Sequence, residues 1–202
     1  MTGIETWLVG RLEADRDLTR PELLELSAAI GAERPLWEHH VRHDVVDRHY
    51  VQMYRDPNID IWLICWAASQ DTGYHDHDRS QGAVYVCEGA VYEDYFRRDE
   101  DGWIREQTKR HDAGGQFDFD ATYIHGVRHA DGSPAVSLHC YSPALWRMGH
   151  YEPDPNGVLR RVAMTYADEL LGGADQEKGP ENEIAGHSIP QATMLVAPPR
   201  GS

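Results

Sequence analysis

The chain has few cysteines, few basic residues relative to acidic ones, and no long apolar run. The three cysteines, Cys65, Cys87 and Cys140, stand apart in apolar surroundings and are odd in number, so we expect reduced, buried thiols and no disulfide framework. The 34 acidic residues outnumber the 19 lysines and arginines and give a formal net charge of -15. This charge repels phosphate backbones and anionic membrane surfaces, so neither nucleic acid nor a membrane is expected as a partner.

The lack of long apolar stretches bears on where the protein works. No segment approaches the roughly 20 apolar residues of a membrane span, and residues 1–10 lack the basic start and apolar core of a secretory signal. We therefore expect a cytoplasmic protein. With 202 residues, 41% of them hydrophobic, the chain is long enough for one domain with a sizeable core.

The first elements expected along the chain are helices. Thr19 and Glu22 have the spacing of a capping box, and apolar residues follow at helical spacing until Gly31, which can take the left-handed C-terminal conformation. This pattern predicts a helix over residues 20–30. A second helix is expected over residues 34–41, so that a helical segment spans about 18–45.

Short runs rich in β-branched and aromatic residues, separated by turn residues, predict strands in the rest of the domain. They lie at residues 50–54, 59–66, 83–86, 90–96, 103–108, 116–119, 136–141 and 159–166. Many short strands joined by turns indicate an all-β sandwich or barrel. Residues 172–202 are rich in glycine, proline and acidic residues, so we expect a tail there and a single domain over residues 1–171.

Histidine is abundant, with 12 in the chain, and two of them are separated by one residue. On a strand, His75 and His77 would point to the same face and could bind one metal ion. The residues that follow resemble the first cupin motif, with Gly82 in the place of its glutamate and Gly89 in the place of its glycine. His125 matches the histidine of the second cupin motif. The likeness predicts a cupin barrel, the double-stranded β-helix, with N-terminal helices.

The ligands that the motifs leave indicate two possible metals. Because Gly82 cannot act as a ligand, the motifs leave His75, His77 and His125. Three neutral imidazoles leave positions open for substrate and dioxygen, which suits ferrous iron, but the same set could hold zinc with a bound water. The spacing does not separate these two metals.

A row of polar residues occupies the strand expected at residues 136–141. Alternation places Ser137, His139 and Tyr141 on one face of that strand. Inside a barrel these groups must satisfy one another or serve a site, because an unpaired buried polar group costs about 1–3 kcal/mol. The alternative is a strand whose polar face contacts solvent.

Together, these segments make the chain similar to the thiol dioxygenases of the cysteine dioxygenase family over residues 18–166. The segments are Ile-Cys-Trp at 64–66, His-Asp-His at 75–77, His125, Ala-Val-Ser-Leu-His-Cys-Tyr-Ser-Pro at 135–143, and Val-Ala-Met-Thr-Tyr at 162–166. The resemblance implies that the three histidines hold Fe(II) and that dioxygen is the co-substrate. It further implies that both oxygen atoms are inserted into the sulfur of a small thiol, which becomes a sulfinic acid.

The same resemblance assigns roles to the polar row and the pocket. Ser137, His139 and Tyr141 would form a hydrogen-bonded catalytic relay whose phenol reaches the substrate. Trp66 and Met164 match pocket-lining positions of the family, although each could equally be a packing residue.

Two positions bear on the branch of the family and on the substrate. Gly82 stands where animal members have a cysteine crosslinked to the relay tyrosine, which resembles the bacterial branch. Gln52, in Tyr50-Val51-Gln52, aligns with an arginine that binds the carboxylate of cysteine, and an amide cannot supply the same charged, bidentate grip. Arg55 could replace the lost charge only if the strand register differs, because it should face the opposite side. Tyr50 either lines the pocket or packs in the core.

Family members with glutamine at this place resemble 3-mercaptopropionate dioxygenases, and some relatives use ergothioneine. We therefore expect a small-molecule thiol partner that is not strictly cysteine, and a monomer by default. Three alternatives stay open: cysteine dioxygenase proper, a zinc or nickel cupin that acts as an isomerase or hydrolase, and a non-enzymatic cupin that binds a small ligand.

Overall fold

The structure is a computed structural model that describes residues 3–12, 15–98, 100, 104–155, 158–171 and 194–195. Its helices are α1 (Gly3–Leu8), α2 (Arg20–Ala32) and α3 (Ala167–Leu171), with two 3-10 turns after α2 (Arg34–Leu36 and Glu38–His40). Its strands are β1 (Tyr50–Arg55), β2 (Asp60–Trp66), β3 (Tyr74–His75), β4 (Gln81–Glu88), β5 (Ala90–Arg98), β6 (Ile104–Asp112), β7 (Gln116–Phe119), β8 (His125–His129), β9 (Ala135–Ser142), β10 (Arg147–Pro153), β11 (Val158–Tyr166) and β12 (Met194–Leu195). Among these residues, no helix is long and apolar enough to cross a membrane.

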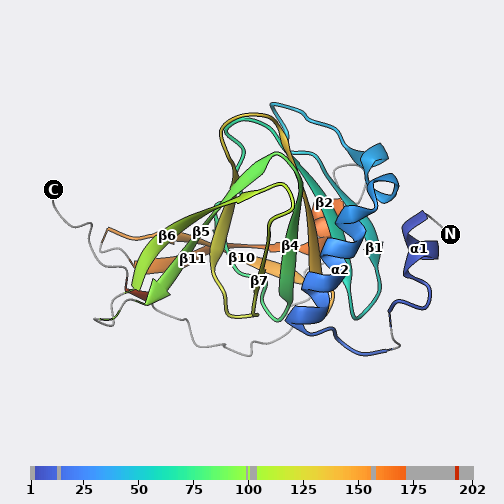
Figure 1. The fold of residues 1–202 in the computed structure, drawn as a ribbon. Coiled ribbons are helices and arrows are strands. Elements are labelled where there is room, and N and C mark those ends of the chain that lie inside the picture. The colour runs from blue at the N-terminus through green and yellow to red at the C-terminus, as the bar shows by residue number, and fades with distance from the viewer. Residues whose placement is uncertain are drawn as a thin grey trace.

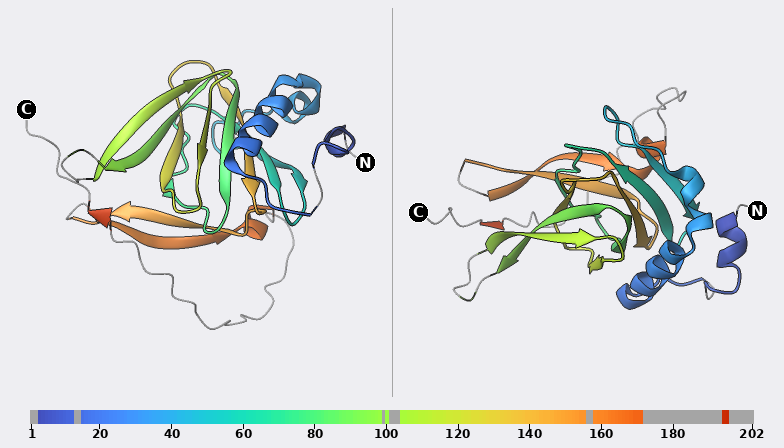
Figure 2. Two further views of the ribbon diagram at one scale, coloured as in Figure 1. Left: turned by 60° about the horizontal axis from the view of Figure 1, so that its bottom comes forward. Right: turned by 45° about the horizontal axis from the view of Figure 1, so that its top comes forward.

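The strands form two sheets that curve into a barrel (Figure 1). The five-stranded sheet has the order β1-β2-β9-β4-β7, and the seven-stranded sheet has the order β12-β11-β10-β3-β8-β5-β6. Strands far apart in sequence lie side by side, as β2 and β9 do. Figure 2 shows α2 against the outer face of the five-stranded sheet. This architecture is the double-stranded β-helix, or cupin barrel, that the motifs predict.

The helix predicted at residues 20–30 forms as α2 because its start is satisfied locally. The main-chain N–H of Thr19 donates to the Glu22 carboxylate at 2.7 Å, which completes the capping box. The helix runs on past Gly31, so the prediction of a left-handed terminus at this glycine is wrong. A Cβ atom at Gly31 would clash with the Tyr85 ring of β4, and the missing side chain lets helix and sheet pack closely.

The second helix, predicted at residues 34–41, is replaced by the two 3-10 turns. The indole N–H of Trp37 donates to the carbonyl oxygen of Gly31 at 3.1 Å and ties this segment to the end of α2. Trp37 is 2% exposed, so its burial against the core opposes continuation as a straight helix.

All eight predicted strands form, with ends that differ by a few residues. The sequence pattern does not predict β3, β8 and β10, which are neighbours in the middle of the seven-stranded sheet. Each has a partner strand on both sides, so the sheet stabilises residues that have little strand preference of their own. Of the tail expected at 172–202, only Met194–Leu195 is described, with its backbone paired to β11; the rest lies outside the described residues.

Two apolar clusters form the core. One packs α1 and α2 against the five-stranded sheet and contains the buried free thiols of Cys65 and Cys140, while Cys87 is a half-buried free thiol beside it. The other fills the barrel interior and includes Trp66 and Tyr141. The polar residues singled out in the sequence lie around this second cluster.

Candidate active site

Three histidines, two on the seven-stranded sheet and one next to it, meet inside the barrel. His75 lies on β3, His125 is its register partner on β8, and His77 follows just beyond the end of β3. The ligand nitrogens of all three lie within 4.8 Å of one another, and each histidine is at most 5% exposed. The structure therefore brings together the residues predicted as metal ligands.

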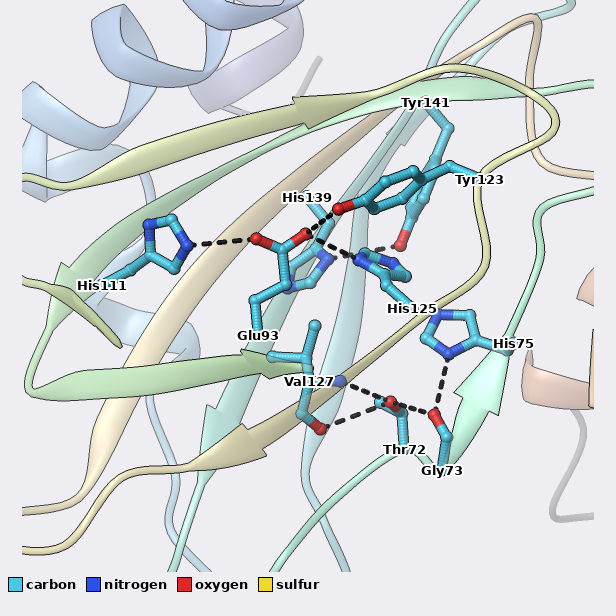
Figure 3. A network of polar contacts seen from close by, with 10 residues as sticks. All are labelled: Thr72, Gly73, His75, Glu93, His111, Tyr123, His125, Val127, His139 and Tyr141. Atoms are coloured by element: carbon cyan, nitrogen blue, oxygen red, sulfur yellow. Dashed lines mark hydrogen bonds and ion pairs between the residues drawn. The ribbon is translucent and has the colours of Figure 1, made fainter. Parts of the chain in front are cut away.

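The protein occupies some of the ring nitrogens and leaves others free. Nδ1 of His75 lies 3.2 Å from the carbonyl oxygen of Gly73, and Nδ1 of His125 lies 3.2 Å from Oε1 of Glu93, so Nε2 of each ring is left for a metal (Figure 3). Neither nitrogen of His77 has a partner within the described chain.

The protonation state of this group suits metal binding. Burial lowers the pKa of His75 and of His77 well below the usual range, so both imidazoles are neutral. A buried polar atom without a partner costs about 1–3 kcal/mol, which a bond to a metal would offset. The three residues therefore fit a metal ion, and a set of neutral nitrogen donors suits iron or zinc.

Glu93, on β5, is a part of the site that sequence reasoning missed. Its carboxylate is 4% exposed and accepts hydrogen bonds from His125, from His111 Nε2 at 3.1 Å and from the Tyr123 hydroxyl at 3.2 Å (Figure 3). Burial opposes ionisation of this group, but the hydrogen bonds from His111 and His125 outweigh it and lower its pKa to about 2. A carboxylate that accepts from the far nitrogen of a metal-binding histidine fixes the tautomer and the ring orientation.

The predicted relay forms on β9 of the opposite sheet. Nε2 of His139 lies 2.8 Å from the Ser137 hydroxyl, and Nδ1 lies 3.3 Å from the Tyr141 hydroxyl. All three residues are buried, so the alternative of a solvent-facing polar row is wrong. Burial lowers the pKa of His139 to about 3 and raises the pKa of Tyr141, so both groups are neutral at physiological pH.

Trp66 sets the direction of this relay. Its indole N–H can only donate, and it donates to the Ser137 oxygen at 2.8 Å. The other hydrogen-bond partner of the Ser137 hydroxyl within the described chain is His139 Nε2, so the serine proton is donated there. His139 then carries its proton on Nδ1 and donates to the Tyr141 oxygen, which leaves the phenol proton free to be donated into the barrel.

A cavity of about 70 Å³ borders His75 and the relay residues His139 and Tyr141. Its polar lining consists of Arg48, Tyr50, Thr72, His75, His139 and Tyr141. Its apolar lining consists of Trp62, Ile64, Val127, Leu145, Met148 and Leu170. Drug-sized ligands occupy pockets of about 300–1,000 Å³, so this cavity has room only for a much smaller molecule.

The residues expected to bind substrate are only partly at this cavity. Tyr50 lines it, but Gln52 donates to Asp60 at 2.9 Å and Arg55 pairs with the same buried carboxylate at 2.6 Å. The cavity instead carries Arg48, which the sequence pattern does not single out.

Two further expected pocket residues also lie elsewhere. Met164, on β11, is half-buried outside the cavity lining, where Met148 of β10 is found instead. Trp66 acts through Ser137 rather than as part of the cavity wall.

Gly82 has a packing role beside the candidate metal ligand His77. It is paired with Tyr141 on one side and Phe119 on the other. A Cβ atom at this position would clash with the Phe119 ring, which stacks on His77 with ring centroids 4.4 Å apart. The aromatic ring takes the space that a side chain at position 82 would need.

The sequence was compared with models of protein families and with curated proteins. A model of the family described as cysteine dioxygenase type I matches residues 11–153, which is most of the chain. No curated protein matches the sequence.

Among solved structures, TT1209 from Thermus thermophilus shares 21% identity over 53% of this chain and 93% of its own, with a TM-score of 0.43. A protein with a double-stranded β-helix domain from Klebsiella pneumoniae shares 13% identity over 52% of this chain and 80% of its own, also with a TM-score of 0.43. A cupin superfamily protein from Desulfitobacterium hafniense shares 10% identity over 50% of this chain and 83% of its own, with a TM-score of 0.41.

Proposed function

Since the chain belongs to the cysteine dioxygenase type I family, we propose that it is a non-haem Fe(II) thiol dioxygenase acting on a small thiol. The reaction joins one thiol and one dioxygen molecule into a sulfinic acid, so both oxygen atoms end on sulfur and no further reductant is needed. The observation that carries the proposal is a small cavity bordered by His75, which belongs to a cluster of three histidines with free nitrogens, and by the Tyr141 phenol, whose proton the relay leaves free.

His75, His77 and His125 would hold the ferrous ion. Bound there, iron would supply the redox chemistry that joins dioxygen to sulfur, while the protein provides binding, orientation and electrostatics. Zinc and nickel are alternatives for the same ligands. An isomerase or hydrolase reaction at such a metal, however, would give the Ser137–His139–Tyr141 relay no role as a proton donor to an oxygenated thiol.

The relay residues would hold and direct a proton at the cavity. The phenol of Tyr141 stays protonated because burial raises its pKa, so it can donate a hydrogen bond to a substrate sulfur or oxygen atom. His139 and Ser137 orient this donor, and Trp66 orients Ser137. The apolar half of the lining keeps bulk water away from the reacting atoms.

The size of the cavity bears on the choice of thiol. With about 70 Å³, it suits a compact thiol of the 3-mercaptopropionate or cysteine type better than the much larger ergothioneine. Because Gln52 is engaged by Asp60, it is not a substitute for a carboxylate-binding arginine.

The test is dioxygen uptake by the iron-loaded protein with cysteine, 3-mercaptopropionate, cysteamine and ergothioneine, followed by mass spectrometry of the product. A gain of two oxygen atoms by one thiol supports the proposal and identifies the substrate. Iron binding without consumption of any thiol would overturn it for this panel and favour a non-oxidative cupin.

A further inference from the structure

Arg48 precedes β1 and extends its guanidinium along the cavity wall. Its carbon Cζ lies 5.1 Å from the centroid of the Trp66 ring, and Nη1 donates to the carbonyl oxygen of Asp71. Nε is buried and has no hydrogen-bond partner within the described chain. A guanidinium has five N–H donors, so most of the donor capacity of Arg48 is not used by the protein.

The charge around this arginine is not balanced by the cavity lining. None of the lining residues is acidic, and His139 is neutral because of its low pKa. Arg48 forms no ion pair with a carboxylate of the described chain; the nearby Asp71 is exposed, and its carboxylate accepts from the Gly73 N–H at 2.8 Å. Burial also lowers the pKa of Arg48, as expected for a partly desolvated charge without a partner.

The contrast with Arg55 supports a ligand role for Arg48. Arg55 is neutralised by Asp60, which is fully buried, so this cation is already used within the protein. Arg48 has no such acid and faces the same cavity as His75 and Tyr141.

Resting on the function proposed above, we propose that Arg48 binds an anionic oxygen group of the thiol substrate and thereby selects mercapto acids over neutral thiols. The guanidinium would donate through its free N–H groups while the sulfur lies at the histidines. The same lining offers no acid to an ammonium group, so a mercapto acid without an amine fits this cavity better than cysteine does.

The test compares 3-mercaptopropionate with its neutral analogue 3-mercapto-1-propanol in wild type, Arg48→Met and Arg48→Lys. We expect the ratio of kcat/KM for the acid to that for the alcohol to fall by about 10- to 100-fold in Arg48→Met, since a hydrogen-bonded charge is lost. The ratio for Arg48→Lys should lie between those of wild type and Arg48→Met, because lysine keeps the positive charge but lacks the paired N–H donors of the guanidinium. Arg42→Met is the matched control, because Arg42 lies on the surface with 70% of its side chain exposed, and its ratio should equal that of wild type. An unchanged ratio in Arg48→Met would overturn the inference.

A binding measurement separates this inference from the proposed function. Calorimetric titration of the zinc-loaded protein with 3-mercaptopropionate needs no oxygen chemistry, and we expect affinity to fall in Arg48→Met by a similar factor. If wild type binds the acid through Arg48 but consumes no oxygen, the dioxygenase proposal fails and the Arg48 assignment stands. If wild type consumes oxygen but neither the affinity for the acid nor the acid preference changes in Arg48→Met, the Arg48 assignment fails and the dioxygenase proposal stands.

Discussion

The buried histidines of the two sheets differ in how their ring nitrogens are used. His139, on the five-stranded sheet, has both nitrogens within reach of a hydroxyl, those of Ser137 and Tyr141. His77, next to the seven-stranded sheet, has neither nitrogen bonded within the described chain, although it is 1% exposed. An imidazole with two protein partners is held in one tautomer, whereas a buried imidazole without partners needs an external ligand. This difference marks His77 as a candidate metal ligand, and His75 and His125 each keep one nitrogen free beside it.

Replacing a metal ligand should have the largest effect. We expect His75→Ala and His77→Ala to lose bound iron, because two histidines alone hold it weakly, whereas His139→Ala should retain it. The measurement is metal content by mass spectrometry after anaerobic iron loading. His129→Ala is the matched control, since that histidine is bonded to the Ser133 carbonyl oxygen outside the site. Equal iron in wild type and His75→Ala would refute the ligand assignment.

Removing the phenol proton should affect turnover and not metal binding. We expect Tyr141→Phe to keep its iron and lose about 100-fold in kcat, a typical contribution of a positioned proton donor. Steady-state oxygen uptake with the best thiol of the panel measures this loss. Tyr92→Phe, a half-buried tyrosine that packs under Arg128, should behave like wild type. Full activity in Tyr141→Phe would show that the relay has no role in the reaction.

Removing the charge behind His125 should have a smaller effect. We expect Glu93→Gln to weaken metal affinity by about 10- to 100-fold, because the carboxylate that orients the ligand is lost. Competition with a chelator measures this affinity, and the exposed Glu152→Gln serves as control. An unchanged affinity would mean that the β8 backbone alone positions His125.

The smallest expected effect is on the pH dependence of stability, which distinguishes the buried His139 from an exposed histidine. An unfolded chain takes up a proton on His139 near its ordinary pKa of 6.5, whereas the folded protein resists this until about pH 3. Wild type should therefore lose stability as the pH falls through this window, and His139→Gln should lose about 1.4 kcal/mol less per pH unit. Urea unfolding of the metal-free proteins at several pH values measures both slopes. Identical slopes in wild type and His139→Gln would show that folding does not lower the pKa of His139.

Those parts of the fold that depend on local pattern could be predicted from the sequence. The capping box at Thr19 starts α2, and runs of β-branched residues form strands, because these preferences act over a few neighbouring residues. The strands β3 and β8 could not be predicted, although they carry His75 and His125. They are short and polar, and pairing with neighbours distant in sequence stabilises them.

The residues of the site also differ in whether they could be predicted from the sequence. The motif spacing and the family likeness identified the three histidines and the Ser137–His139–Tyr141 row, because these residues recur in fixed patterns. Glu93 is one of many acidic residues in the chain, and nothing in its own strand marks it as the partner of His125. Its role follows from the pairing of β5 with β8, which places the two side chains together inside the barrel.

The sequence by itself determined the chemical inventory of this protein: the three candidate metal ligands, the Ser137–His139–Tyr141 row and the strand that carries this row. Only the tertiary structure decided the partners of polar and charged side chains: Gln52 and Arg55 bind Asp60, and Arg48 is left at the cavity. The reason is physical. Alternation along a strand predicts the face of a residue from its neighbours, whereas the neutralisation of a buried charge depends on which distant residue the fold brings within hydrogen-bond distance.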